Sequence, residues 1–304
     1  MTRRRGVPRP LGAAAGLALD RLLPEPPSAL HPVVLFAFLM TGLERRIHRD
    51  ARGAGLLHAL VGVALGVGAG AVVRSTALAT TSAVAGRALA GTAGDVGHAL
   101  EARDEDAARR MLPSLVGRDP SGLGAGEIAR AVVESVAENT VDAVVAPAFW
   151  GALAGAPGAL GYRSVNTLDS MVGHRSARYA NYGWASARLD DVVAWVPARL
   201  TAALVALVRP RAAPAVWAAV RRQAPAHPSP NAGVAEAAFA AALGLRLGGV
   251  SRYADRVEER PHLGSGRPPV VGDIAAAVRL SGDVSAAFAG GLALIGCARW
   301  WWTR

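Results

Sequence analysis

Three carboxylates recur at every fourth position in one short stretch of the chain. Glu134, Glu138 and Asp142 follow this spacing, which on a helix places them on one face. Like charges at this spacing repel each other unless a cation lies between them, and Mg²⁺ takes oxygen ligands and bridges to phosphates. The apolar run 143–161 follows directly, and acids at a membrane boundary are costly and usually functional. The pattern predicts a magnesium site, with a solvated helix face as the alternative.

A second stretch, residues 162–191, mixes Asn, Asp, Arg, Ser and aromatic residues without an amphipathic period. Core packing does not explain this mixture, and guanidinium groups match phosphate oxygens. We interpret Asp169, Asp190 and Asp191 as candidates to bind a cation or to orient an amine. Arg163 and Arg188 are candidates to bind phosphate. The alternative is a set of turns and helix caps around Asn166, Asp169 and Ser170.

A third stretch begins at Ser229-Pro230-Asn231 and continues as an Ala-rich helix pattern with Glu236 about one turn in. Ser and Asn at this place are typical helix caps. A free helix N-terminus also binds anions such as phosphate. Both interpretations, a cap and a phosphate site, remain open for Ser229 and Asn231.

The elements around these residues are strongly apolar. Charged residues make up 18% of the chain, against about 25% in an ordinary soluble domain, and the mean hydropathy is +0.27. A membrane span needs about 20 apolar residues, and four runs approach this length, at 54–73, 143–161, 192–208 and 284–298. With the polar helical segment 74–142, they predict an all-α, polytopic integral membrane protein that forms a single domain over residues 1–304.

The net charge of +10 comes entirely from Arg, since the chain contains no Lys. The Arg residues are scattered between apolar runs rather than gathered in one stripe, which favours membrane flanks over a nucleic-acid partner. Nine of them precede Ala54, and this bias predicts a cytoplasmic N-terminus. A phosphate-binding loop with its Lys and a Gly-x-Ser-x-Gly elbow are both missing from the sequence.

Local patterns predict where helices begin and end. We expect helices over Val96–Met111, ended by Pro113, and over Leu123–Asp142, and a loop over Arg252–Pro269. Strand alternation is nearly absent. Pro147 and Pro157 lie inside the apolar run 143–161, so we expect this run to be broken or re-entrant rather than a simple crossing.

Four strings together resemble the CobD/CbiB family of cobalamin biosynthesis. They are Val-Glu-Ser-Val-Ala-Glu-Asn-Thr (133–140), Val-Asn-Thr-Leu-Asp-Ser-Met-Val-Gly (165–173), Gly-Trp-Ala-Ser-Ala-Arg-Leu-Asp-Asp (183–191) and Ser-Pro-Asn-Ala-Gly (229–233). The resemblance extends from about Asp20 to the last apolar run. The chain departs from the family pattern near its start, where only His31-Pro32-Val33 remains.

The resemblance implies an ATP-dependent, amide-forming ligase, an adenosylcobinamide-phosphate synthase. It implies Mg²⁺ and ATP, a corrinoid substrate, aminopropanol or its phosphate, membrane lipid, other cobalamin-pathway enzymes as partners, and a multi-pass cell-membrane protein whose active site faces the cytoplasm. In this scheme we assign catalytic roles to Glu134, Glu138, Asp169 and Asp190, and metal binding to Glu134, Glu138, Asp142 and Asp191. Substrate or phosphate binding is assigned to Asn139, Arg163, Asn166, Arg188, Ser229 and Asn231.

Two alternatives come from other functional classes. A polytopic transporter would suit Arg199 inside an apolar run and broken helices, but transporters usually contain internal repeats and none is visible. A membrane sensor related to AmpE would not need the acid-rich motifs.

Overall fold

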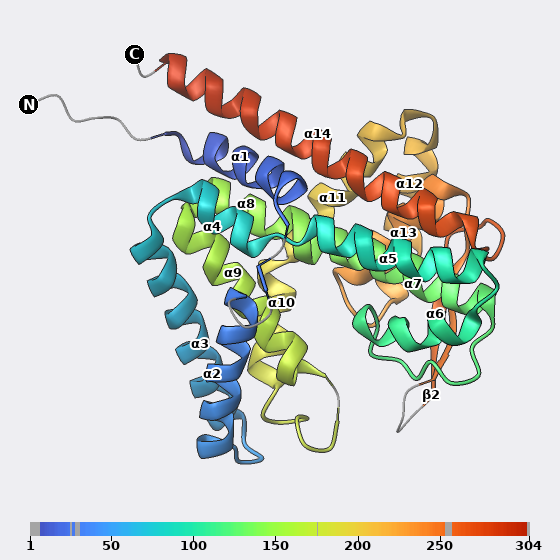
Figure 1. Cartoon of the computed structure of the whole chain (residues 1–304), viewed down its shortest axis with the longest axis horizontal. Helices are drawn as coiled ribbons and strands as arrows, with labels where there is room; N and C mark the ends of the chain where they lie inside the picture. Colours follow the sequence, from blue (N-terminus) through green and yellow to red (C-terminus); the bar gives the residue numbers. More distant parts are fainter. Residues whose placement is uncertain (1–6, 25, 28–30, 175, 253–256, 303–304) are drawn as a thin grey trace, which may run out of the picture. The chain divides into compact units, whose positions relative to one another are not determined.

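The computed structural model of the chain describes residues 7–24, 26–27, 31–174, 176–252 and 257–302 (Figure 1). The described chain is mostly helical and divides into two compact units, between which the polypeptide alternates. The first unit comprises residues 1–85, 142–194 and 288–304, and the second comprises residues 86–141 and 195–287.

The first unit is a bundle of helices. Its elements are α1 (Arg9–Leu22), α2 (Pro32–Ile47), α3 (Arg52–Val73), α4 (Thr76–Ala83), α8 (Ala146–Ala154), α9 (Ala156–Leu168), α10 (Trp184–Val193) and two π-helical turns, η3 (Val141–Val145) and η4 (Asp169–Gly173). Helix α3 packs along α9, and α1 packs against α4 and α8.

Helix α3 meets α9 through glycines. The positions that it buries include Gly62, Gly66 and Gly70, which recur every four residues and therefore share one face. A Cβ atom at Gly66 would collide with the Ser164 hydroxyl, and one at Gly70 would lie 2.5 Å from the Ala156 carbonyl oxygen. The small side chains thus allow the two backbones to approach closely, as in helix pairs within membranes.

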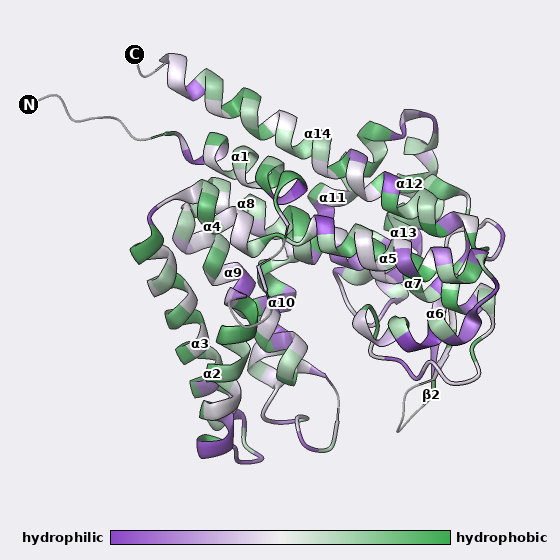
Figure 2. Cartoon of the chain, viewed as in Figure 1, coloured by the Kyte–Doolittle hydropathy of each residue, from purple (hydrophilic) through white to green (hydrophobic). Residues whose placement is uncertain are grey.

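The large apolar side chains of α3 point the other way. Leu56, Leu57 and Leu60 are about half exposed, and Figure 2 shows hydrophobic residues along this helix. A surface helix of a soluble protein buries its apolar stripe, so glycine inward and leucine outward is the arrangement of a helix that faces lipid. Among the described helices, α3 and α14 (Gly272–Trp302) are long and apolar enough to cross a membrane. A third span results if α10 and α11 together form one bent span.

The four predicted apolar runs have different outcomes. Runs 54–73 and 284–298 lie within the single helices α3 and α14. Run 143–161 is divided at Gly155, whose φ of +73° suits glycine, into α8 and α9, which pack against each other. This confirms the expected break. Run 192–208 is not one helix, because α10 ends at Val193 and α11 (Trp195–Val208) begins two residues later.

The second unit packs shorter helices around α13. Its elements are α5 (Gly86–Glu101), α6 (Glu105–Met111), α7 (Ala125–Thr140), α11, α12 (Ala213–Arg222), α13 (Ala232–Leu243), β1 (Leu247–Arg252), β2 (Val257–Leu263), the first part of α14 and short 3₁₀ turns at 112–114, 210–212 and 224–226. Helix α13 contacts α7, α11, α12 and the β-strands.

The β-hairpin corrects the all-α prediction. Strands β1 and β2 pair antiparallel, with Val250 opposite Glu259, so residues 257–263 form a strand within the predicted loop 252–269. The sequence of β2 lacks alternation between apolar and polar residues. The strand is held by its pairing with β1 rather than by a buried apolar face.

The helix predicted over Val96–Met111 is also wrong as a single element. Arg103 has a φ of +61°, a left-handed conformation that interrupts a helix, and Asp104 caps the new helix α6 by accepting from the Ala107 amide at 2.8 Å. The chain therefore turns between α5 and α6. The second predicted helix is confirmed from Ala125 to Thr140 as α7.

The packing of α3 on α9 predicts that Gly66→Ala destabilises the protein by about 1–3 kcal/mol, because overpacking a close contact forces the backbones apart. Gly68→Ala is the matched control on the same helix, since a Cβ there meets no atom within 4 Å. Chemical unfolding of the detergent-solubilised variants measures both. Equal stability of the two variants would contradict the close approach.

Candidate functional site

The candidate residues form two groups, one in each unit. Glu134, Glu138 and Asn139 lie on α7 in the second unit. Asp142, which continues the four-residue spacing, belongs to the first unit and to the π-helical turn η3. The predicted row of three carboxylates is therefore divided between the units.

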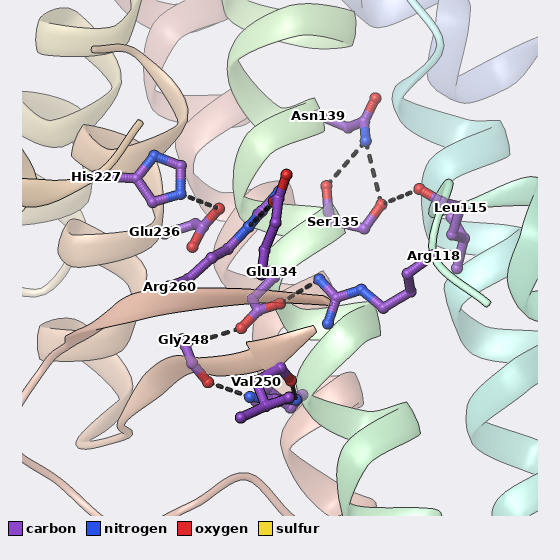
Figure 3. Close-up of polar contacts among 12 residues, drawn as sticks. Leu115, Arg118, Glu134, Ser135, Asn139, His227, Glu236, Gly248, Val250 and Arg260 are labelled. Atoms are coloured by element: carbon purple, nitrogen blue, oxygen red, sulfur yellow. Dashed lines mark hydrogen bonds and ion pairs between the residues drawn. The ribbon is translucent and has the colours of Figure 1, made fainter. Parts of the chain in front are cut away.

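Glu134 is held by two strong donors. Its side chain is 4% exposed, and one oxygen accepts from the Arg118 guanidinium at 2.5 Å. The other accepts from the Gly248 backbone amide at 2.9 Å. Glu134 thus joins the segment before α7 to the hairpin (Figure 3). With both oxygens bound, Glu134 acts as an anchor rather than as an open metal ligand.

Other polar side chains of α7 extend this anchor. Arg130 donates to the carbonyl oxygens of Gly248 and Val250, the latter at 2.7 Å. The Ser135 hydroxyl donates to the Leu115 carbonyl at 2.8 Å, and the Asn139 amide donates to the Ser135 carbonyl at 3.0 Å. Asn139 therefore bonds back to its own helix.

Glu138 is the accessible acid of this cluster. Its side chain is exposed. Burial raises its pKa, the positive charges of Arg260 and Arg118 lower it, and the negative charge of Glu134 raises it again, with a net rise. A carboxyl group with a raised pKa is better suited to accept and donate protons than an ordinary one.

Ser229 and Asn231 shape the start of α13. The Ser229 hydroxyl accepts from the backbone amides of Asn231 at 3.3 Å and Ala232 at 3.1 Å, as the cap interpretation expects. The Asn231 side-chain oxygen accepts from Arg199 at 2.9 Å. The phosphate-binding role of both residues stays a prediction.

In the first unit, three elements bring acids together around Asp190. The charges of Asp142 on η3, Asp169 on η4 and Asp191 on α10 all act on the Asp190 carboxylate, which also receives a hydrogen bond from Asn166. The second oxygen of Asp190 is buried and has no hydrogen-bond partner among the described residues. Both turns that carry the partner acids are π-helical, a feature frequent at functional sites.

Neighbouring side chains complete this acid cluster, which comprises Asp142, Asp169, Asp190 and Asp191. The Tyr162 hydroxyl donates to Asp142 at 3.5 Å. Arg163 donates to the Asn166 side-chain oxygen at 3.3 Å, so that its positive charge lies beside the acids. Arg188 is different, since its side chain is 68% exposed and it reaches only Asp191, at 3.7 Å.

The two clusters differ in their fit to Mg²⁺, which takes oxygen ligands and keeps several waters. The Asp190 cluster combines four carboxylates with a buried oxygen that lacks a partner among the described residues. In the second unit, Glu134 is already fully bonded. Within the described residues, no group of three or more His, Cys, Asp or Glu side chains is placed so that it could hold a metal ion.

Glu44 clamps the loop between Asp169 and Asp190 to helix α2. This buried carboxylate of α2 accepts from Arg178 and from the Tyr179 hydroxyl, each at 2.9 Å. His48 bonds to the Arg178 carbonyl oxygen at 3.3 Å, and Asn181 donates to Asp50 at 3.0 Å. The corner between α2 and α3 thus positions the loop whose ends carry the acids.

Comparison with known proteins decides the family. The CobD/Cbib protein family matches residues 13–281. The chain belongs to the CobD/CbiB family. It is 48% identical to the cobalamin biosynthesis protein CobD of Mycobacterium tuberculosis strain H37Rv, over 91% of this chain and 93% of that protein. The protein of the same name from Geobacter metallireducens is 42% identical over 83% of this chain and 85% of its own. No solved structure matches the chain.

The four strings that carried the CobD/CbiB resemblance supply both clusters. String 133–140 forms the last half of α7, string 165–173 forms the end of α9 with η4, string 183–191 runs into α10, and string 229–233 starts α13. Sequence reasoning missed three members of the polar cluster around Glu134 in the second unit, namely His227, Arg118 and Arg260. These residues lie outside the strings, and only the fold brings them to the cluster.

The Glu134 anchor predicts that Arg118→Met destabilises the protein by about 3–5 kcal/mol, because it leaves a buried carboxylate without its counter-charge. Chemical unfolding in detergent measures the change. Arg110→Met, at an exposed position of α6, is the control and should change stability little. If both variants unfold alike, the buried ion pair does not stabilise the unit.

The Glu44 clamp predicts a pH-dependent stability. Burial alone would raise the pKa of Glu44, but hydrogen bonds from Arg178 and Tyr179 and the Arg178 charge outweigh it and hold the pKa below its ordinary value. The clamp's contribution is therefore present above the unfolded-state pKa and is lost as the pH falls through the folded-state pKa. Glu44→Gln should lower the melting temperature at pH 7 more than at pH 4. A pH-independent difference would refute the clamp.

Proposed function

We propose that this protein is an adenosylcobinamide-phosphate synthase, which forms an amide between aminopropanol, or its phosphate, and the free propionate carboxylate of adenosylcobyric acid. Membership of the CobD/CbiB family supports this proposal, as do relatives named for cobalamin biosynthesis. The carboxylate must be activated before an amine can displace its oxygen, and ATP is the proposed co-substrate.

The acid cluster around Asp190 is the single observation that carries the chemistry. In this proposal Asp142, Asp169, Asp190 and Asp191 hold Mg²⁺, which supplies charge neutralisation for phosphate oxygens. Arg163, beside the cluster, binds a phosphate group through its guanidinium fork. Asn166 orients Asp190 by the hydrogen bond that joins them.

The second-unit cluster is proposed for acid–base chemistry on its own evidence, independently of the Asp190 cluster. An amine is protonated at neutral pH and must lose a proton before its lone pair attacks the activated carbonyl carbon. Glu138 is accessible and has a raised pKa, so it is the group that takes this proton. Glu134 lies one turn before Glu138 on α7 and anchors that helix through Arg118 and Gly248.

We further propose a multi-pass location in the cell membrane with the active site facing the cytoplasm. The glycine-inward packing of α3 and the length of α14 support it. Trp301 and Trp302 are 80% and 91% exposed next to Arg299, which is the composition of an interface anchor.

A ligation assay tests the function directly. Detergent-solubilised protein is mixed with adenosylcobyric acid, ATP, Mg²⁺ and either aminopropanol or its phosphate, and the corrin product is weighed by mass spectrometry. A mass gain equal to amide formation supports the proposal. No product with either amine, in the presence and absence of cell extract, would favour a transporter or a sensor.

Asp190→Asn should reduce amide formation by at least 100-fold, because it replaces a carboxyl oxygen at the centre of the acid cluster by an amide nitrogen while keeping the shape of the side chain. Asp95→Asn, at an exposed position of α5, should retain wild-type turnover. Initial rates at saturating ATP measure both variants. Wild-type turnover in Asp190→Asn would exclude the cluster from the reaction.

A further inference from the structure

A cavity of the second unit lies between the start of α7 and the β-hairpin. Its volume is about 460 Å³, which is within the range of small-molecule sites. Basic side chains from three elements line it, namely Arg130 of α7, Arg246 just before β1 and His262 of β2. All of its lining residues belong to the second unit, so the site is complete within one compact body.

The backbone of β1 lets two of these side chains converge. Gly249 has a φ of +88°, a conformation that suits glycine. A Cβ atom at this position would lie 3.0 Å from Arg130 Nη1 and 3.2 Å from His262 Cε1. The guanidinium and the imidazole therefore approach the same point beside Gly249, and a larger residue there would push them apart.

Arg130 is a fixed cation. It donates to the carbonyl oxygens of Gly248 and Val250, the latter at 2.7 Å, and these bonds hold the guanidinium against the hairpin. No acidic side chain of the described residues forms an ion pair with it, so its charge is not neutralised there. A guanidinium has five N–H donors, and those not used by the two carbonyls can bond to a ligand.

His262 is oriented by its own strand pair. Its Nδ1 atom lies 3.3 Å from the Leu247 carbonyl oxygen. A carbonyl oxygen only accepts, so Nδ1 carries the proton of this bond, and Nε2 is the ring atom that can bond to a ligand. When both nitrogens are protonated, Nε2 donates to an anion.

Arg246 supplies a second guanidinium without an internal role. Its backbone amide donates to the Arg267 carbonyl oxygen at 2.8 Å, which fixes the position of the residue. Its side chain is exposed and forms no ion pair or hydrogen bond with the described part of the chain. The planar fork of Arg matches two oxygens of a phosphate group.

The one acid in the cavity wall has another task. Glu127 accepts from the Gly124 backbone amide at 3.1 Å through Oε2 and so caps the start of α7. Two guanidinium groups against this single carboxylate leave the cavity with a positive charge. A divalent cation needs several oxygen ligands, so the wall favours an anion and not a metal ion.

We propose that this cavity binds the phosphate group of a small ligand through Arg130, Arg246 and His262. Guanidinium–phosphate bonds are charge-assisted and can be bidentate. The inference rests on the proposed ligase function for the source of the phosphate, because that reaction uses ATP and an amine that can carry a phosphate. In that scheme Arg163 serves a phosphate beside Mg²⁺, whereas this cavity serves a phosphate that carries no metal.

Equilibrium binding to the full-length protein in detergent tests the site. Inorganic phosphate, aminopropanol phosphate and ATP without Mg²⁺ are titrated by calorimetry, with unphosphorylated aminopropanol as the reference. Arg246→Gln and His262→Gln should weaken binding of a phosphorylated probe by about 10–100-fold, the usual effect of losing a hydrogen bond to a charged group. Binding of unphosphorylated aminopropanol should not change.

Arg221→Gln, at an exposed position of α12, is the matched control and should bind as the wild type does. Arg246→Gln removes no bond within the described part of the chain, so it should keep the wild-type melting temperature. Three results would overturn the proposal. They are no binding of any phosphorylated probe to the wild type, unchanged binding in both cavity variants, and equal weakening in Arg221→Gln.

A second pair of variants closes the cavity without changing its charge. Gly126 lines the cavity in the first turn of α7, and a Cβ there would lie 3.8 Å from the Pro269 carbonyl oxygen. Gly126→Leu therefore has room to fold and should block phosphate binding. Gly91→Leu is the control, at an exposed position of α5 where a Cβ meets no atom within 4 Å. Equal binding by these two variants would contradict a ligand inside the cavity.

The same titrations identify the source of the phosphate. A loss confined to aminopropanol phosphate assigns the cavity to the amine substrate, and a loss confined to ATP assigns it to the nucleotide. A loss with all three probes assigns it to the phosphate group alone. Binding does not depend on turnover. If the ligation assay gives no amide while Arg246→Gln still weakens phosphate binding, the ligase proposal fails and the phosphate site stands.

Discussion

The buried bond between Glu134 and Arg118 is the interaction on which the second unit depends. Taking both charges out of water is costly, and the cost is offset only when every remaining oxygen finds a donor. The Gly248 amide provides that donor, so one carboxylate joins α7, the segment before it and the β-hairpin. Because the Glu134 charge is fixed in this way, it acts on Glu138 and Glu236 and favours their protonated forms. The same residue thus anchors the unit and raises the pKa of its two neighbouring carboxyl groups.

The first unit follows a different physical rule. Glycines on α3 let its backbone approach α9, and the leucines that would form a core in a soluble protein remain on the outside. Such packing depends on van der Waals contact rather than on the burial of apolar area. The acids Asp142 and Asp169 lie where π-helical turns interrupt the regular helices, since a regular helix would direct their side chains elsewhere. The close backbone packing and the acid cluster are therefore both features of the first unit.

Sequence patterns were most informative where the physics is local. The four-residue spacing predicted one long α7 with Glu134 and Glu138 on it, and Pro147 and Pro157 predicted the break that lies at Gly155. The hairpin was missed because β2 has no alternation of its own and is held by pairing with β1, to which Arg130 donates hydrogen bonds. The predicted carboxylate row failed for a related reason. Spacing places three acids on one helix face, but it does not show that the helix changes to a π-turn at Val141.

The sequence by itself determined the family, the helical and apolar character of the chain and the identity of most acids in both clusters. These follow from residue order, because helix periodicity, glycine spacing and the family strings are all read along the chain. Only the tertiary structure decided which acids are anchors and which can hold a proton. Glu134 meets Gly248, 114 residues away, and His227 faces Glu236 across the start of α13. Protonation depends on burial and on charges brought together by the fold, and no spacing in the sequence specifies either.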